Sequence, residues 1–179
     1  MSQSINLYKQ LANHKLFNKS VNFGLKRIKL ALALLGHPEK KLKNVISVVG
    51  ESGKFTTLFS LKSFIEASNQ NVTTHISPSL RDIRERFYMG EKYLNHKEIK
   101  KTIKQIEKLN IPLTIFECLT LVYIINASKI NVDYNIQETG ALWRLDSNNI
   151  HDFPKIQICT NINKPVSYTH LTLPTSSRV

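Results

Sequence analysis

Cysteine is scarce in this sequence, which has only two among its 179 residues, Cys118 and Cys159. They lie far apart, each in an apolar segment, so they form no disulfide framework and favour a reducing compartment. Residues 1–19 are polar and lack the apolar core of a secretory signal. The most apolar stretch, residues 111–127, contains a proline and a glutamate and is too short to cross a bilayer comfortably. We therefore expect a cytoplasmic protein without a membrane partner.

Acidic residues are also few, since 13 Asp and Glu stand against 25 Lys and Arg, a formal net charge of +12. Such an excess favours anionic partners: nucleotides, polyanionic metabolites or nucleic acid. Five lysines between residues 97 and 108 surround Ile99, Ile103 and Ile106 as the solvated face of one helix. No aromatic residues interleave with these lysines to form a stacking platform for bases. We therefore favour a solvated surface, and a basic nucleic-acid-binding module remains an alternative.

The apolar spacing along the chain predicts alternating strands and helices. Hydrophobic residues make up 41% and charged residues 21%, as in one ordinary globular domain. The expected helices cover residues 1–20, 24–35, 56–67, 97–109 and 114–128, and the expected strands cover residues 45–49, 72–76, 132–137 and 155–160. This alternation predicts an α/β fold, a parallel sheet with flanking helices, whose ligands lie at the carboxyl ends of the strands.

Two segments carry neither pattern. Residues 39–43 are interpreted as a basic linker into the first strand. Residues 81–88 are dense in charge without helical apolar spacing, and we interpret them as a loop over a ligand cleft, with a plain exposed linker as the alternative.

Residues 44–57, N-V-I-S-V-V-G-E-S-G-K-F-T-T, combine a β-branched strand, a glycine turn with a lysine and the start of a helix. Phosphate-binding loops are built in this order. Glycines let backbone N–H groups point inward, the helix N-terminus adds partial positive charge, and the lysine reaches the outer phosphates.

The match to the usual phosphate-loop pattern is imperfect. Val48 stands where the pattern has its first glycine, and Phe55 separates Lys54 from the hydroxyls of Thr56 and Thr57. On these residues alone, nucleotide binding and an ordinary strand-to-helix turn remain equally open. The other strand ends favour the first interpretation, because Ser77, Glu138 and the Thr160–Asn161 pair also follow expected strands.

Glu117 stands within the most apolar expected helix. A carboxylate in such surroundings is costly unless it is paired, coordinates an ion or contacts a ligand. The alternative is a glutamate at the helix edge that faces water, and the sequence leaves both open.

Taken together, four stretches resemble the folylpolyglutamate synthase/dihydrofolate synthase family, relatives of the Mur-type cell-wall ligases. Gly50-Glu51-Ser52-Gly53-Lys54-Phe55-Thr56 is similar to G-T-N-G-K-G-S/T, Ser77-Pro78-Ser79-Leu80 with Glu85-Arg86 to S-P-H-L with E-R, Thr114-Ile115-Phe116-Glu117 to T-x-F-E, and residues 138–149 to E-V-G-L-G-G-R-L-D-A-T-N. An early Phe23-Gly24-Leu25-Lys26-Arg27 echoes L-G-L-E-R. Order and spacing agree over about residues 22–163.

The resemblance implies the central P-loop domain of a Mur-type ligase, with ATP and Mg²⁺ as cofactors. ATP binding is implied for Gly50, Glu51, Ser52, Gly53, Lys54 and Thr56, with Lys54 as the catalytic cation. Mg²⁺ binding is implied for Ser77 and Glu138, whose oxygen atoms suit that hard ion. Substrate binding is implied for Asn22, Phe23, Gly24, Leu25, Thr114, Ile115, Phe116, Glu117, Leu145, Asp146 and Ser147.

The implied reaction passes the γ-phosphoryl group of ATP to a carboxylate of dihydropteroate or tetrahydrofolate. The amine of L-glutamate then attacks the acyl phosphate and expels phosphate, which leaves an amide bond. Such chemistry needs charge neutralisation and in-line positioning rather than a protein nucleophile. A generic P-loop kinase or NTPase is the alternative, but it leaves residues 138–149 unexplained. We expect a monomer.

The chain departs from the family pattern at several points. Phe55, Leu142 and Trp143 replace glycines, Ser79 replaces a histidine, and Glu51 adds a negative charge to an anion-binding loop. We interpret the chain as a divergent branch rather than an inactive paralogue, because the charged residues of the motifs are retained.

The expected organisation is an N-terminal helical segment at residues 1–20 and a partial ATP-binding domain at residues 21–164. Residues 165–179 change abruptly to Thr, Ser and Leu and resemble translated adapter sequence, so His170 is not promoted to a metal ligand. We expect the family's C-terminal domain to be absent from this chain. We therefore expect weak nucleotide binding at best, and no product, from this chain alone.

Overall fold

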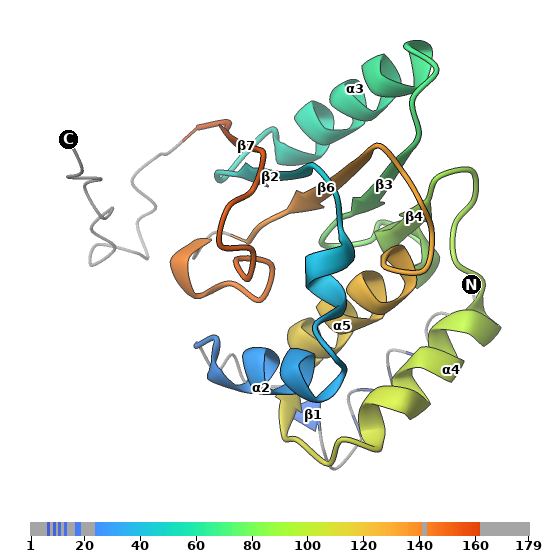
Figure 1. Ribbon diagram of the computed structural model, residues 1–179, viewed down its shortest axis with the longest axis vertical. Coiled ribbons are helices and arrows are strands. Elements are labelled where there is room, and N and C mark those ends of the chain that lie inside the picture. Colours follow the sequence, from blue (N-terminus) through green and yellow to red (C-terminus); the bar gives the residue numbers. More distant parts are fainter. Residues whose placement is uncertain are drawn as a thin grey trace.

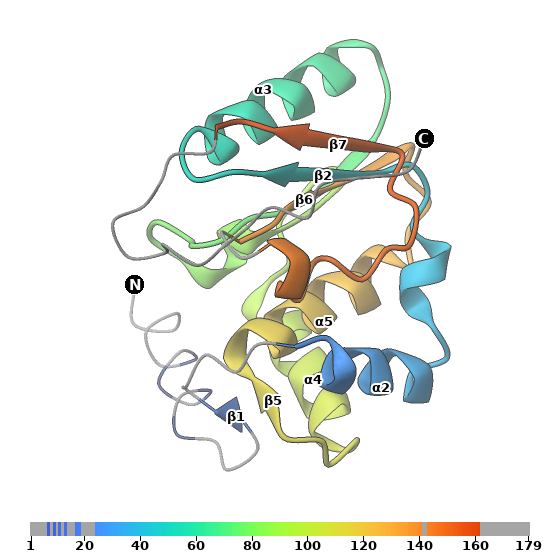
Figure 2. The ribbon, with the colours of Figure 1, turned by 90° about the vertical axis from the view of Figure 1, so that its left-hand side faces the viewer.

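The computed structural model describes residues 24–140 and 143–161, together with Leu7, Lys9, Leu11, Asn13, Phe17 and Asn18. In these parts a five-stranded sheet lies between two helical layers, with α3 on one face and α2, α4 and α5 on the other (Figures 1 and 2). This is the predicted α/β architecture. No helix in the described parts is both long and apolar enough to cross a membrane.

The sheet has the strand order β4-β3-β6-β2-β7. The strands are β2 (Val45–Val49), β3 (Val72–His75), β4 (Phe87–Met89), β6 (Tyr134–Glu138) and β7 (Ile156–Cys159). β2 pairs in parallel with both β6 and β7, and β6 pairs in parallel with β3. All five residues of β2 are buried, which explains why all but Ser47 are apolar, because a parallel strand is covered on both faces.

The sheet is mixed rather than wholly parallel, because an edge strand that the sequence did not predict, β4, runs antiparallel to β3. The same residues overturn the prediction of a loop or exposed linker at 81–88. The segment forms η2 (Ile83–Arg86) and then β4, and Ile83 and Phe87 are completely buried. The charged residues of this segment suggested an exposed loop, although Arg86 is itself buried. The linker expected at 39–43 likewise contains a short helix, η1 (Pro38–Lys41).

On one face, α3 (Lys54–Ala67) covers the sheet through Leu58 and Ile65. On the other face lies the larger core, around α5 (Ile115–Ala127), which is buried on nearly every side as predicted. α4 (His96–Glu107) packs Ile99, Ile103 and Ile106 inward, and its lysines face water. α2 (Lys26–Leu34) adds Ile28, Ala31 and Leu32 to this core.

The N-terminal segment differs from the expected helix. Leu7, Lys9 and Leu11 are helical, and both leucines are buried. Residues Phe17–Asn18 instead form β1, which pairs in parallel with β5 (Leu113–Thr114), so the helix expected over residues 1–20 ends before Phe17. The other residues of that segment, and the tail at 165–179, lie outside the described residues.

Candidate functional site

The predicted site residues gather where the parallel strands end. The loop of residues 50–53 follows β2, Ser77 follows β3 closely, Glu138 ends β6, and Thr160 follows β7. Because these strands run in parallel, their carboxyl ends meet at one edge of the sheet. The sheet therefore brings together the loop, Ser77 and Glu138, as expected.

The loop itself is shaped by two glycines. Gly50 and Gly53 have φ values of 130° and 80°, conformations that side chains with a Cβ rarely adopt. Gly53 precedes α3, which begins at Lys54. The Lys54 ammonium donates hydrogen bonds to Gly50 O at 2.8 Å and Glu51 O at 3.3 Å, so in this state it is folded back over the loop.

The end of β7 braces the same loop. Asn161 Oδ1 accepts from Ser52 N at 2.9 Å, and Asn161 O accepts from Glu51 N at 3.1 Å. The Thr160 hydroxyl donates to Ser52 O at 2.7 Å. A Cβ on Gly50 would overlap the Thr160 hydroxyl, so this approach requires glycine.

Phe55, which replaces a family glycine, is accommodated along α3. Its ring packs against Phe59 with centroids 4.4 Å apart, and the residue is 40% exposed. Thr56 follows it in the first turn of α3. The bulk of Phe55 is therefore compatible with the loop conformation.

Glu138 is held between two donors. Ser77 N donates to Oε2 at 3.0 Å, and the Lys54 ammonium lies 3.8 Å from Oε1. Burial raises the pKa of Glu138, while the Ser77 amide, Lys54 and Arg86 oppose that rise. The carboxylate is thus largely removed from water and lies near two cations and a backbone N–H, while the nearby Asp146 carboxylate helps to raise its pKa.

Ser77 and Glu138 fit the needs of Mg²⁺. In the described residues no three His, Cys, Asp or Glu side chains gather as a metal-binding group. Mg²⁺ does not need such a group, because it prefers oxygen ligands and commonly combines one or two protein ligands with water and phosphates. The Ser77 hydroxyl and the Glu138 carboxylate supply two oxygens beside the loop.

Arg86 is a residue of this edge that composition and spacing do not single out, except as part of the E-R resemblance. Only 5% of it is exposed, and its Nη1 donates to Ser77 Oγ at 3.0 Å. That the guanidinium is buried and donates to a polar side chain of the site could be found only from the fold.

Glu117 is paired, which decides between its two interpretations. Its Oε2 lies 3.2 Å from Arg27 Nε of α2 and accepts from Thr114 N at 2.7 Å. Thr114 Oγ1 in turn accepts from Glu117 N, so the pair forms the capping box of α5. Glu117 Oε1 is buried and has no hydrogen-bond partner among the described residues.

The third predicted substrate segment also contacts α5. Ser147 Oγ lies 2.8 Å from Thr120 Oγ1, and Asn148 Nδ2 donates to Glu138 O at 2.9 Å. The segment begins with η3 (Trp143–Leu145), and burial raises the pKa of the following Asp146. α5 and β6 therefore connect this segment to both Glu117 and Glu138.

The remaining substrate candidates are distributed around these contacts. Gly24 and Leu25 precede α2, whose Arg27 contacts Glu117. Ile115 is partly buried, whereas Phe116 and Leu145 are exposed at 53% and 45%. Asn22, Phe23 and Leu142 lie outside the described residues.

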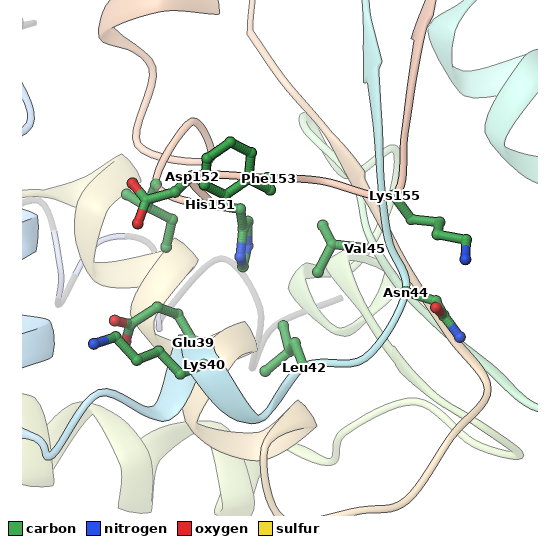
Figure 3. A pocket seen from close by; sticks show the side chains of 10 residues that line it. Glu39, Lys40, Leu42, Asn44, Val45, His151, Asp152, Phe153 and Lys155 are labelled. Atoms are coloured by element: carbon green, nitrogen blue, oxygen red, sulfur yellow. The ribbon is translucent and has the colours of Figure 1, made fainter.

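A cavity of about 470 Å³ lies elsewhere, near the amino ends of β2 and β7 (Figure 3). Glu39, Val45, His151 and Phe153 are among its lining residues. His151 Nε2 lies 2.8 Å from Gln137 Nε2, and burial lowers the pKa of His151 to about 4. The loop of residues 50–53 lies at the carboxyl ends of β2 and β7, whereas this cavity lies near their amino ends. The two are therefore at opposite edges of the sheet.

The chain is similar in sequence to known proteins over much of its length. No family model matches the chain. The dihydrofolate synthase/folylpolyglutamate synthase of Bacillus subtilis (strain 168) is 30% identical over 148 residues, covering 78% of this chain and 34% of that protein. Its counterpart in Buchnera aphidicola subsp. Schizaphis graminum is 35% identical over 143 residues, covering 78% and 33%. The chain thus spans about one third of the length of these relatives.

Solved structures are also similar to this chain in fold. Escherichia coli FolC in complex with DHPP and ADP has a TM-score of 0.77 at 31% identity, covering 87% of this chain and 37% of that one. A bifunctional folylpolyglutamate synthase/dihydrofolate synthase with Mn, AMPPNP and L-glutamate bound has a TM-score of 0.70 at 31% identity, covering 75% and 34%. With this agreement in sequence and in fold, the chain belongs to the folylpolyglutamate synthase/dihydrofolate synthase family.

Proposed function

We propose that this chain supplies the phosphate- and metal-binding part of an ATP-dependent ligase that joins L-glutamate to a carboxylate of dihydropteroate or tetrahydrofolate. One observation carries the proposal: Lys54, Ser77 and Glu138 meet at the carboxyl edge of the sheet, with Lys54 3.8 Å from Glu138. The relatives are named for this activity, and two solved structures contain ADP or AMPPNP. Their names favour the ligase over a generic P-loop kinase.

Each polar residue has a role in this proposal. Lys54 exchanges its bonds to loop carbonyls for phosphate oxygens and neutralises their charge. The loop of residues 50–53 and the first turn of α3, with Thr56, surround the phosphates. Ser77 and Glu138 would hold Mg²⁺, which when bound supplies further charge neutralisation on the phosphates.

The substrate side of the site is proposed around the start of α5. Gly24, Leu25, residues 114–117 and residues 145–147 lie along the contacts that link α2, α5 and η3. Glu117 Oε1 supports this assignment, because a buried carboxylate oxygen without a partner gains stability when a ligand N–H donates to it. Pterins carry such N–H donors.

We also keep two broader proposals. Residues 21–164 form one phosphate-binding unit, supported by the five-stranded sheet, whose strands lie between Val45 and Cys159. A cytoplasmic location is supported by Cys118 and Cys159, which are both free thiols.

Titration of the chain with MgADP, followed by amide chemical shifts, tests the proposal. We expect shifts at residues 50–56 that saturate with a millimolar or lower Kd, and their loss in Lys54→Met. Lys62→Met, on the same helix but paired with Glu66, is the matched control and should bind as the unmodified chain does. Shifts that spread over the surface lysines of α4 instead of the loop would contradict the proposal.

A further inference from the structure

Arg86 is a buried cation with a specific partner. It ends η2, at the start of the antiparallel edge strand, and only 5% of it is exposed. Its Nη1 donates to Ser77 Oγ at 3.0 Å and lies 3.5 Å from Ile76 O. Burying a guanidinium is costly unless its hydrogen bonds are satisfied, so these contacts fix where Arg86 lies.

The backbone of Arg86 is anchored by a rigid group of rings. Arg86 O accepts from Ile76 N at 3.3 Å and lies 3.2 Å from His75 Nδ1, which must be the donor because a carbonyl only accepts. The His75 ring stacks with Phe87 and with Tyr123, with centroids 5.6 and 5.0 Å away. Well-packed neighbours therefore hold the backbone of Arg86 while its side chain contacts Ser77.

The direction of the hydrogen bond matters for Ser77. A guanidinium can only donate, so Ser77 Oγ accepts one bond through one lone pair. The second lone pair and the hydroxyl hydrogen of Ser77 Oγ then point away from the bond that Arg86 makes. Ser77 is also fixed on its other side, because its backbone N donates to Glu138 Oε2 at 3.0 Å.

We propose that Arg86 is a positioning residue, which holds the Ser77 hydroxyl in one rotamer so that its free lone pair faces a divalent cation beside the phosphate loop. The inference rests on the proposed function for the cation, but the fixed rotamer is a property of the chain itself. Arg86 acts through Ser77 and does not contact substrate in this role.

The Ser77 χ1 rotamer, measured by NMR coupling constants in the chain without ligand, tests the inference directly. We expect one rotamer in the unmodified chain, averaging in Arg86→Met, and partial recovery in Arg86→Lys, which keeps one donor and the charge. A single Ser77 rotamer in folded Arg86→Met would overturn the inference. This measurement needs no bound metal.

Mn²⁺ binding in the presence of ADP gives the second measurement, by electron paramagnetic resonance. We expect Arg86→Met and Ser77→Ala each to weaken Mn²⁺ binding about tenfold, and the double variant to be no weaker than Ser77→Ala. An additional tenfold loss in the double variant would count against action through Ser77. Failure of the unmodified chain to bind Mn²⁺ and ADP would contradict the proposed function, while the rotamer would still decide the role of Arg86.

Discussion

The Lys54 ammonium lies 3.8 Å from Glu138 Oε1, and both side chains are largely buried. Removing one member leaves the other charge with less compensation, so we expect Lys54→Met and Glu138→Gln each to lower the free energy of unfolding by about 1–3 kcal/mol. Urea denaturation of both single variants and the double variant measures the coupling. We expect a coupling of about 1 kcal/mol, and strict additivity would show that the pair does not interact.

Substitutions of Gly50 and Gly53 distinguish two costs of adding a Cβ, namely backbone strain and steric overlap with a neighbour. Both have positive φ, but only Gly50 would bring its Cβ onto Thr160 and Asn161, whereas Gly53 faces open space. We expect Gly53→Ala to cost about 1 kcal/mol through backbone strain, and Gly50→Ala to cost about 2–3 kcal/mol. Thermal unfolding of both variants provides the comparison. Equal losses would mean that the β7 contact does not constrain the loop.

The two capping boxes differ in burial. Thr114 and Glu117 cap α5 inside the core, whereas Asn95 and Glu98 cap α4 at the surface. We expect Thr114→Ala to lower the free energy of unfolding by about 2 kcal/mol and Asn95→Ala by about 1 kcal/mol or less. Urea denaturation at neutral pH tests the order. A larger loss for Asn95→Ala would contradict it.

Because of His151, we expect the free energy of unfolding to fall in mild acid. Burial lowers its pKa from 6.5 to about 4, so the unfolded chain binds a proton between these values and the folded chain does not. Stability is therefore complete above pH 6.5 and falls as the pH drops toward 4, with a loss of up to about 1.4 kcal/mol at pH 5.5. Urea denaturation at pH 7.5 and 5.5 measures it.

The control is His151→Asn, which cannot titrate in this range. Its loss of stability between pH 7.5 and 5.5 should be smaller than that of the unmodified chain by the contribution of one histidine. An identical pH dependence in both proteins would place the acid sensitivity elsewhere.

Glu51 adds a negative charge to the loop that is proposed to bind phosphates. We expect Glu51→Thr to strengthen MgADP binding roughly fivefold, because about 1 kcal/mol of charge repulsion is removed. Isothermal titration calorimetry measures the change. Glu91→Thr, in the turn after β4 at the opposite end of the strands, is the matched control and should leave the affinity unchanged. No gain in Glu51→Thr would show that the loop is built around this charge.

Local patterns predicted the elements closest to the site. The β-branched run of β2 and the apolar spacing of α3 and α5 are short-range signals, and the structure confirms all three elements. Parallel strands then bring Ser77 and Glu138 to the loop without further information. The site edge was therefore predictable from strand order along the chain.

Long-range pairing was not predictable. Glu117 had two open interpretations because its partner, Arg27, lies 90 residues earlier. The β4 strand was missed because the charges of residues 81–88 make the segment look exposed, although Arg86 is buried and donates to Ser77, nine residues earlier. In each case a charged residue is buried because a polar partner satisfies it, and apolar periodicity cannot reveal that partner.

The hydrogen bonds that join Ser52 to Thr160 and to Asn161 span 108 and 109 residues of chain. During synthesis, β2 and its glycine turn leave the ribosome long before the strand that completes them. Contacts between residues so distant in sequence close slowly, because the loop entropy must be lost first. The phosphate loop is thus among the last parts of this sheet to acquire its final shape, and a nascent chain that ends before β7 carries the motif without its geometry.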